Sequence, residues 1–257
     1  MCQLLGMNCN TPTDICFSFE GFRARGGRTD QHSDGWGIAF FEAGGSRLFL
    51  DDRASADSPI ADLVRRYPIR SLNVIAHIRK ATHGLVALRN THPFQRELWG
   101  RYWVFAHNGE LQDFVPTSDG RFRPVGDTDS EAAFCHLLNQ LQTAFPAAPP
   151  SSVALLQHLR EISREIARHG MFNFLLSDGE LLFAHCASDL HYTLRRAPFT
   201  SAHLIDEDVS VDFSELTGSD DRVAVIATQP LTDNEAWTRM AAGELLAFHQ
   251  GRPLARS

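Results

Sequence analysis

The feature that most constrains the fold of this chain is a series of short apolar or alternating runs separated by turn residues. Eight such runs occur, each four to seven residues long, at positions 3–7, 37–41, 47–50, 73–78, 101–106, 171–177, 181–184 and 222–228. Runs of this length, bounded by Gly, Pro, Asn or Asp, are typical of β-strands. The chain is therefore predicted to build its core from sheets.

Four segments show helical periodicity instead, at positions 15–25, 59–66, 130–142 and 153–169. The last carries a single apolar stripe of Leu155, Leu156, Leu159, Ile162 and Ile166. Strands and helices come in blocks and do not alternate regularly, which favours an α+β fold in which helices cover sheets. Residues 145–152 are rich in Pro and Ala and form a loop too short to link two domains, so we expect one domain over residues 2–257.

The net charge of the chain indicates which kinds of partner it can bind. A formal net charge of -7, from 24 basic and 31 acidic residues, argues against a nucleic-acid surface, which requires a dominant basic patch. A small neutral or zwitterionic substrate fits this charge better. The first twenty residues lack a basic leader region, and no uninterrupted apolar run reaches membrane-spanning length. We therefore expect a cytoplasmic protein that binds neither nucleic acid nor membrane.

The chain has five cysteines, an odd number without Cys-x-x-Cys spacing, which disfavours both a disulfide framework and a thiolate zinc site. The histidines show no spacing typical of a metal site either, so neither a metal nor a cofactor is predicted. Cys9, Cys16, Cys135 and Cys186 are interpreted as structural.

The fifth cysteine, Cys2, directly follows the initiator methionine. Removal of Met1, which the small Cys side chain permits, would place a thiol and a free α-amine on one residue. A thiol attacks as the thiolate, and an α-amine with an ordinary pKa of about 7.7 to 8.0 can accept a proton near neutral pH. Cys2 is therefore a candidate nucleophile that carries its own base, although a cysteine in this position is more often a small buried apolar residue.

Three further segments place polar or glycine residues beside an apolar run. After the run at 73–78, Arg79, Thr82 and His83 enter a loop, where the Arg79 guanidinium could bind a carboxylate through two parallel hydrogen bonds. Asn108 and Gly109 follow a strand predicted to end at position 106, and their side-chain amide and backbone N–H could form an oxyanion hole.

The third segment, residues 126–131, opens a predicted helix, with Thr128 and Glu131 at capping-box spacing and Asp129 near the helix start. Each of these segments has a plainer explanation, namely a surface ion pair, an Asn-Gly hairpin turn and an N-terminal helix charge. Together, however, they supply a nucleophile, a carboxylate clamp, an oxyanion pair and an ammonium partner. Hydrolysis of an amide on a zwitterionic amino acid requires this set.

These motifs resemble those of the class II glutamine amidotransferases, the N-terminal-nucleophile hydrolases whose glutaminase domain begins with a catalytic cysteine, and most of all their stand-alone bacterial members. The motifs cover most of the chain in the family's order: Cys2, residues 79–84, Asn90-Thr91-His92-Pro93, His107-Asn108-Gly109 and Thr128-Asp129-Ser130-Glu131. The resemblance implies a four-layer αββα sandwich with Cys2 at the end of a central strand.

The resemblance also implies the substrate and the role of each residue. Glutamine or a γ-glutamyl compound would bind with its α-carboxylate on Arg79 and its α-ammonium on Asp129, while Asn108 and Gly109 form the oxyanion hole. Thr82 and His83 would line the same pocket.

Two details bear on the edge of this pocket. Lys80 stands where the family commonly has Trp, so the packing beside Arg79 is expected to differ. Asp34 and Trp36 belong to a Ser-Asp-Gly-Trp-Gly segment that resembles a signature of the stand-alone members. This segment is either a loop near the pocket or a glycine-rich turn into the next strand.

Three functions stay open. The first is a glutaminase whose ammonia passes to an unidentified synthase subunit, because family members usually carry an acceptor domain and none is expected here. The second is a γ-glutamyl amide or peptide hydrolase that uses the same pocket. The third is a catalytically silent protein that senses a glutamyl compound or binds a partner protein. The acidic residues of 202–221 are interpreted as a solvated loop, with a partner surface as the alternative.

Overall fold

The structure is a computed structural model that describes residues 2–81, 85–116 and 120–254. In chain order its strands and α-helices are β1 (Gln3–Thr13), α1 (Cys16–Ala24), β2 (Trp36–Glu42), β3 (Gly45–Asp51), α2 (Pro59–Arg66), β4 (Ser71–Ile78), β5 (Phe94–Leu98), β6 (Arg101–Leu111), α3 (Asp129–Ala144), α4 (Ser152–Ile166), β7 (Gly170–Ser177), β8 (Leu182–Cys186), β9 (His191–Arg196), β10 (Ser201–His203), β11 (Ser210–Asp212), β12 (Arg222–Ala227), β13 (Thr238–Arg239), β14 (Glu244–His249) and β15 (Arg252–Pro253).

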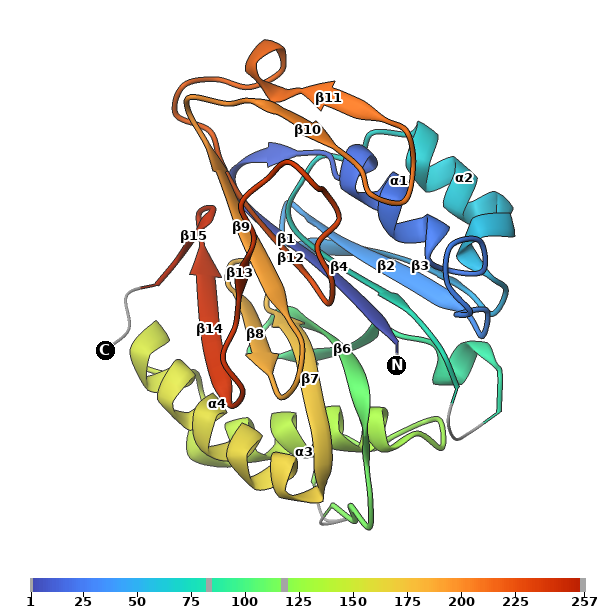
Figure 1. Ribbon diagram of the computed structural model, residues 1–257. Helices are drawn as coiled ribbons and strands as arrows, with labels where there is room; N and C mark the ends of the chain where they lie inside the picture. The colour runs from blue at the N-terminus through green and yellow to red at the C-terminus, as the bar shows by residue number, and fades with distance from the viewer. Residues whose placement is uncertain (1, 82–84, 117–119, 255–257) are drawn as a thin grey trace.

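Two antiparallel sheets form the centre of the molecule (Figure 1). The first has seven strands in the order β13-β9-β12-β1-β4-β2-β3, and the second has six in the order β15-β14-β8-β7-β6-β5. Helices α1 and α2 cover the outer face of the first sheet, and α3 and α4 cover the outer face of the second. The predicted α+β fold, a four-layer αββα sandwich, is confirmed.

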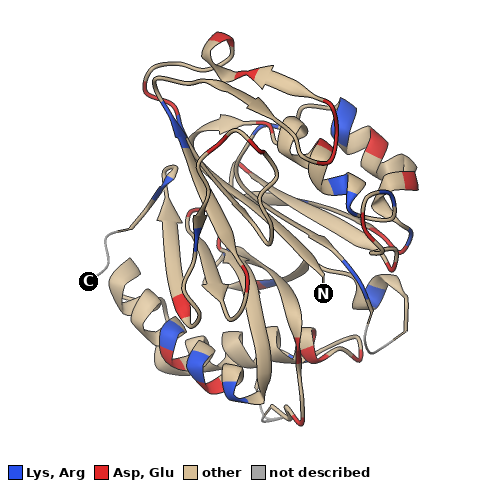
Figure 2. Ribbon diagram, viewed as in Figure 1, with Lys and Arg blue, Asp and Glu red and all other residues tan. Residues whose placement is uncertain are grey.

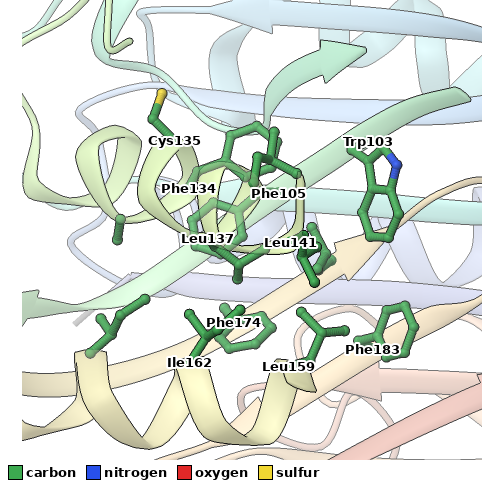
Figure 3. Close-up of a cluster of buried hydrophobic side chains, with 14 of the residues drawn as sticks. Trp103, Phe105, Phe134, Cys135, Leu137, Leu141, Leu159, Ile162, Phe174 and Phe183 are labelled. Carbon is green, nitrogen blue, oxygen red and sulfur yellow. The ribbon is translucent and has the colours of Figure 1, made fainter. Parts of the chain in front are cut away.

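Alternation along each strand decides which layer a side chain enters. In β1, Leu5 and Met7 pack under α1 and α2, whereas Leu4 packs between the two sheets with residues of the second sheet such as Val104 and Leu175. Figure 3 shows the layer between the second sheet and its helices, where Phe105 stacks on a ring of α3. The labelled side chains of this layer are Trp103, Phe105, Phe134, Cys135, Leu137, Leu141, Leu159, Ile162, Phe174 and Phe183.

All eight predicted strands and all four predicted helices are present, with shifted ends. The largest shift concerns β6, since the prediction that this strand ends at position 106 is wrong. Its pairing with β7 continues through Asn108 opposite Asn173 and Gly109 opposite Phe172. A complete backbone ladder outweighs the local turn preference of Asn-Gly, so these two residues lie inside a strand and form no hairpin turn.

The interpretation of residues 202–221 as a solvated loop is also wrong in part. The segment contains β11 and most of β10, which pair as a hairpin. Between these strands, the Asp206 carboxylate accepts a hydrogen bond from Arg25 Nε at 2.7 Å, and the two side chains are only 11% and 8% exposed. Arg25 follows α1 directly, so this ion pair ties the hairpin to the helix layer (Figure 1).

Charged side chains lie mainly on the outside of the sandwich. Arg and Glu alternate along α4, and α2 carries one Asp and two Arg, while most of the strand surface carries no charge (Figure 2). No helix in the described part of the chain is long and apolar enough to cross a membrane.

Candidate functional site

Cys2 lies directly before β1, the middle strand of the seven-stranded sheet. By strand alternation it shares the face of Leu4, which points toward the second sheet. The neighbouring strand β4 pairs Ile78 with Gln3, so the residues that follow β4 run past Cys2. The Lys80 N–H donates to the Cys2 thiol at 3.3 Å, and the thiol lies 3.4 Å from the Lys80 carbonyl.

Arg79 follows β4 on the same inner face and is 4% exposed. Its backbone N–H donates to the carbonyl of Gly35 at 2.8 Å, and its guanidinium donates to the carbonyl of Leu85 at 3.0 Å. The backbone and the guanidinium of Arg79 are therefore each held by one carbonyl, and the charge of the guanidinium acts on Cys2. Thr82 and His83, which are also predicted to line this pocket, lie outside the described residues.

Asn108 reaches the same region from the second sheet. In β6, Val104 and Ala106 pack between the sheets, and alternation gives Asn108 the same direction. Its Nδ2 lies 3.5 Å from the Thr228 hydroxyl, which also accepts a hydrogen bond from the Leu4 N–H at 2.9 Å. The amide of Asn108 is thereby connected to β1 two residues after Cys2.

Gly109 has a steric reason to be glycine. A Cβ at this position would run into the carbonyl of Met171, which lies across the β6–β7 pair. The backbone of Asn108 is fixed as well, because Asn173 Nδ2 donates to its carbonyl at 3.0 Å. Both members of the predicted oxyanion pair therefore sit on a rigid strand, which suits preorganised donors.

Asp129 is the first residue of α3. Its carboxylate accepts hydrogen bonds from the backbone N–H groups of Leu111 and Ser130, both at 2.8 Å, so it joins the end of β6 to the start of the helix. The ring of His107 makes a second connection, because its Nδ1 lies 2.8 Å from the Ser130 hydroxyl and its Nε2 lies 3.0 Å from the carbonyl of Met171. The carbonyl can only accept, so Nε2 donates and the Ser130 hydroxyl donates to Nδ1.

The predicted capping box is present in half. The Thr128 hydroxyl accepts from the Glu131 N–H at 3.2 Å, as expected of an N-cap. The Glu131 carboxylate does not accept from the Thr128 N–H, as a full capping box would require. It accepts instead from the N–H groups of Val125 and Gly126. It thereby shapes the loop that leads into α3.

Electrostatics show that these groups share one region. Burial raises the pKa of the Cys2 thiol, while the Lys80 N–H and the charge of Arg79 lower it and the charge of Asp129 raises it. Arg79 and Asp129 are thus both near enough to act on the thiol. The other four cysteines are free thiols, and burial raises the pKa of Cys9 and of Cys16 to about 12.

Asp34 and Trp36 have different environments. Asp34 adjoins the site, since its carboxylate accepts from the Ala81 N–H at 2.8 Å and its own N–H donates to the Arg79 carbonyl at 3.2 Å. Trp36 is fully buried on the opposite face of the sheet, with its ring centroid 5.6 Å from that of Phe19 in α1. The structure does not bring this side chain to the inner face that Cys2 shares.

Sequence reasoning missed Thr228, and it named His92 only as part of a motif, without pairing it with His77. His77 lies on the inner face two residues before Arg79, and its ring centroid is 4.2 Å from that of His92. Burial lowers the pKa of His77 to about 3 and holds the pKa of His92 well below its usual value. A period-of-two reading of β4 from Arg79 could have placed His77 on this face. No local signal singles out Thr228.

The described residues include no group of three or more His, Cys, Asp or Glu side chains that could hold a metal ion. The arrangement therefore offers a thiol, a guanidinium, a carboxylate and amide donors. These groups suit acyl transfer from an amide whose carrier has one carboxylate and one ammonium group.

Comparison with known proteins agrees with this chemistry. The sequence model of the glutamine amidotransferases class-II family matches residues 1–257. Two proteins that carry the provisional name glutamine amidotransferase are similar throughout. The Haemophilus influenzae protein is 54% identical over 99% of this chain and 86% of its own length, and YafJ of Escherichia coli is 53% identical over 98% of both.

Solved structures support the fold. A Pseudomonas aeruginosa protein, also provisionally assigned as a glutamine amidotransferase, has 50% identity and a TM-score of 0.80 over 99% of this chain and 100% of its own. The phosphoribosylpyrophosphate amidotransferase of B. subtilis matches with 12% identity and a TM-score of 0.58, over 98% of this chain and 48% of its own, and so shows the fold alone. With the family model matched from end to end and relatives above 50% identity, this chain belongs to the class II glutamine amidotransferase family.

Proposed function

We propose that this protein hydrolyses the γ-carboxamide of glutamine, with Cys2 as an N-terminal nucleophile. The observation that supports this function most strongly is that the charges of Arg79 and Asp129 both act on the Cys2 thiol, while Asn108 is connected through Thr228 to the strand that follows Cys2. A purely structural role would not require a thiol, an amide and both charge signs in the same place.

The proposed reaction begins when the thiol of Cys2 attacks the γ-carbonyl carbon. Because burial raises the pKa of this thiol, its resting form is protonated, and the proton must move to a base as the bond forms. Once Met1 has been removed, the α-amine of Cys2 is that base. It then delivers the proton to the departing ammonia, and water hydrolyses the γ-glutamyl thioester to glutamate.

Charge develops on the carbonyl oxygen in both tetrahedral intermediates. The Asn108 side-chain amide and the Gly109 N–H are the proposed donors to this oxygen. Arg79 binds the α-carboxylate of the substrate, and Asp129 binds its α-ammonium. These two charged groups recognise the glutamyl part alone, so they also accept a γ-glutamyl amide or peptide.

The experiment that tests this function is intact-mass analysis of the purified protein before and after incubation with a diazo-ketone analogue of glutamine, followed by peptide mapping. We expect loss of Met1 and one adduct on Cys2. The Cys2→Ala variant should take up no label and should keep its fold, because its side chain is not part of a core cluster. Retained Met1, or a free Cys2 that stays unlabelled, would contradict the function and favour a silent glutamyl-binding protein.

Turnover assays then identify the leaving group. Glutamine and a γ-glutamyl dipeptide are supplied at equal concentration, and glutamate release is measured. A preference for glutamine supports a glutaminase that feeds ammonia to a separate synthase subunit. A preference for the dipeptide supports a γ-glutamyl hydrolase with the same nucleophile.

A further inference from the structure

We infer that Thr228 is a positioning residue that fixes the Asn108 amide relative to the nucleophile, an inference that rests on the proposed function. Thr228 directly follows β12 and is 3% exposed. Ala224 and Ile226 of that strand pack between the two sheets, so alternation directs the Thr228 side chain into the same space.

Three hydrogen bonds hold the backbone and hydroxyl of Thr228 in place. Its N–H donates to the Leu4 carbonyl at 3.1 Å, and its hydroxyl accepts from the Leu4 N–H at 2.9 Å. Its carbonyl accepts from His191 Nδ1 at 3.0 Å. The hydroxyl is therefore fixed with respect to β1, two residues after Cys2.

The hydroxyl also provides the side-chain contact of Asn108. Asn108 Nδ2 lies 3.5 Å away, at the long end of the hydrogen-bond range, while Oδ1 is buried and has no partner among the described residues. The orientation of the amide consequently depends on one contact, and that contact comes from the opposite sheet. The second N–H of the same amide stays available for an oxyanion.

Thr228 thus connects the two halves of the proposed machinery. The nucleophile belongs to the first sheet and the oxyanion donor to the second, and small sliding of one sheet over the other would separate them. The Thr228 hydroxyl bonds to Leu4 in the first sheet and to Asn108 in the second, so it limits this sliding. Donors that are already oriented need no reorganisation when charge develops, so loss of the hydroxyl should slow the chemical step more than it weakens substrate binding.

The test compares Thr228→Val, which keeps the shape and removes the hydroxyl, with Thr228→Ser, which keeps the hydroxyl. The control is Thr193→Val on β9, a buried threonine that pairs with Val225 on the helix-covered face. We expect kcat for glutamine or the γ-glutamyl dipeptide to fall about tenfold or more in Thr228→Val, with KM within threefold. Thr228→Ser and Thr193→Val should stay within threefold of the wild type in both constants.

Amide hydrogen exchange at Leu4 provides a readout of the contact itself. Exchange should accelerate in Thr228→Val and stay near wild type in Thr228→Ser, because only the former removes the acceptor of the Leu4 N–H. Equal kcat values in folded Thr228→Val and wild type would overturn the inference and leave the proposed function intact. Equal losses in Thr228→Val and Thr228→Ser would also overturn it, since the retained hydroxyl of Thr228→Ser would then not protect turnover. If the wild type turns over neither substrate, the proposed function fails and Thr228 is a structural contact only.

Discussion

At the scale of single residues, Asn108 gains its proposed role from its position inside β6. The strand holds its backbone through Asn173, while its side chain enters the space between the sheets with Oδ1 unpaired among the described residues. A buried amide oxygen without a partner is costly, so the residue contributes less to stability than a fully bonded asparagine would. An unpartnered amide at this position therefore agrees with a role in the proposed reaction.

Asn108→Ala is predicted to lower kcat by about two to three decades, because one preorganised donor to the oxyanion is lost. Steady-state glutamate release measures this effect. Asn234→Ala, at an exposed asparagine, serves as the control and should keep wild-type kcat. A kcat loss smaller than threefold in folded Asn108→Ala would show that Asn108 is not a donor to the oxyanion.

His77 is predicted to make the protein sensitive to acid. Its pKa is about 3 in the folded state against about 6.5 when unfolded, so between these values the unfolded chain binds the additional proton. Stability from this residue is complete above about pH 6.5 and is lost as the pH falls toward 3. The loss should be on the order of 2 kcal/mol between pH 6.5 and 5. Urea unfolding at both pH values measures it.

The comparison for this prediction is His77→Gln, which should make the dependence of the unfolding free energy on pH less steep, while His92, whose pKa also lies well below its usual value, keeps part of that dependence. An identical pH slope in wild type and His77→Gln would show that His77 does not govern the acid response.

At the scale of elements, the start of α3 positions Asp129. The N-cap Thr128, the carboxylate of Asp129 and the His107–Ser130 contact all act within the first turn of the helix. The helix therefore begins at one defined place relative to β6. A local change at the cap should therefore alter the position of the Asp129 carboxylate, the proposed ligand of the substrate ammonium, as well as the stability of the protein.

Thr128→Ala is predicted to cost about 1 kcal/mol of unfolding free energy, the usual value of an N-cap hydroxyl. It should also raise KM for the substrate, because Asp129 is displaced. Ser151→Ala is a matched control, since Ser151 caps α4 through the same type of bond to the Ala154 N–H but lies away from the site. We expect the control to lose similar or smaller stability and to keep KM. Equal KM values in Thr128→Ala and Ser151→Ala would show that the N-cap of α3 does not affect substrate binding.

At the scale of the whole molecule, contacts between distant segments hold the layers together. The Arg25–Asp206 ion pair joins the end of α1 to the β10–β11 hairpin, and its two residues are 181 positions apart in the sequence. Arg25 also donates to the carbonyls of Gln229 and Pro230, which follow β12. One buried guanidinium therefore links three segments that meet only in the folded chain.

Asp206→Ala is predicted to destabilise the protein by about 3 kcal/mol or more, because it leaves the buried charge of Arg25 without its anion. Thermal unfolding of this variant measures the loss. Asp208→Ala, at an exposed acid of the same hairpin, should change stability by less than about 0.5 kcal/mol. Equal stability of the two variants would restore the interpretation of this segment as a solvated loop.

The sequence alone predicted the family, the four α-helices and eight of the fifteen strands that the structure describes. Apolar runs and helical periodicity are local properties, so the stripe from Leu155 to Ile166 and the start of α3 at Thr128 could be recognised without coordinates. The motif residues were recognisable by type and order for the same reason. Strands without an apolar pattern, such as β9, were missed because their pairing partners stabilise them and their own residues do not.

Which residues come into contact became evident from the folded chain. The continuation of β6 through Asn108, the burial of Asp206 and the contact of Thr228 with Leu4 all depend on pairing between strands or packing between layers. The bond between Leu4 and Thr228 spans 224 positions, and no local pattern encodes such a separation. Hydrogen-bond partners and burial are properties of the assembled layers, and for that reason the candidate site is complete only in the folded molecule.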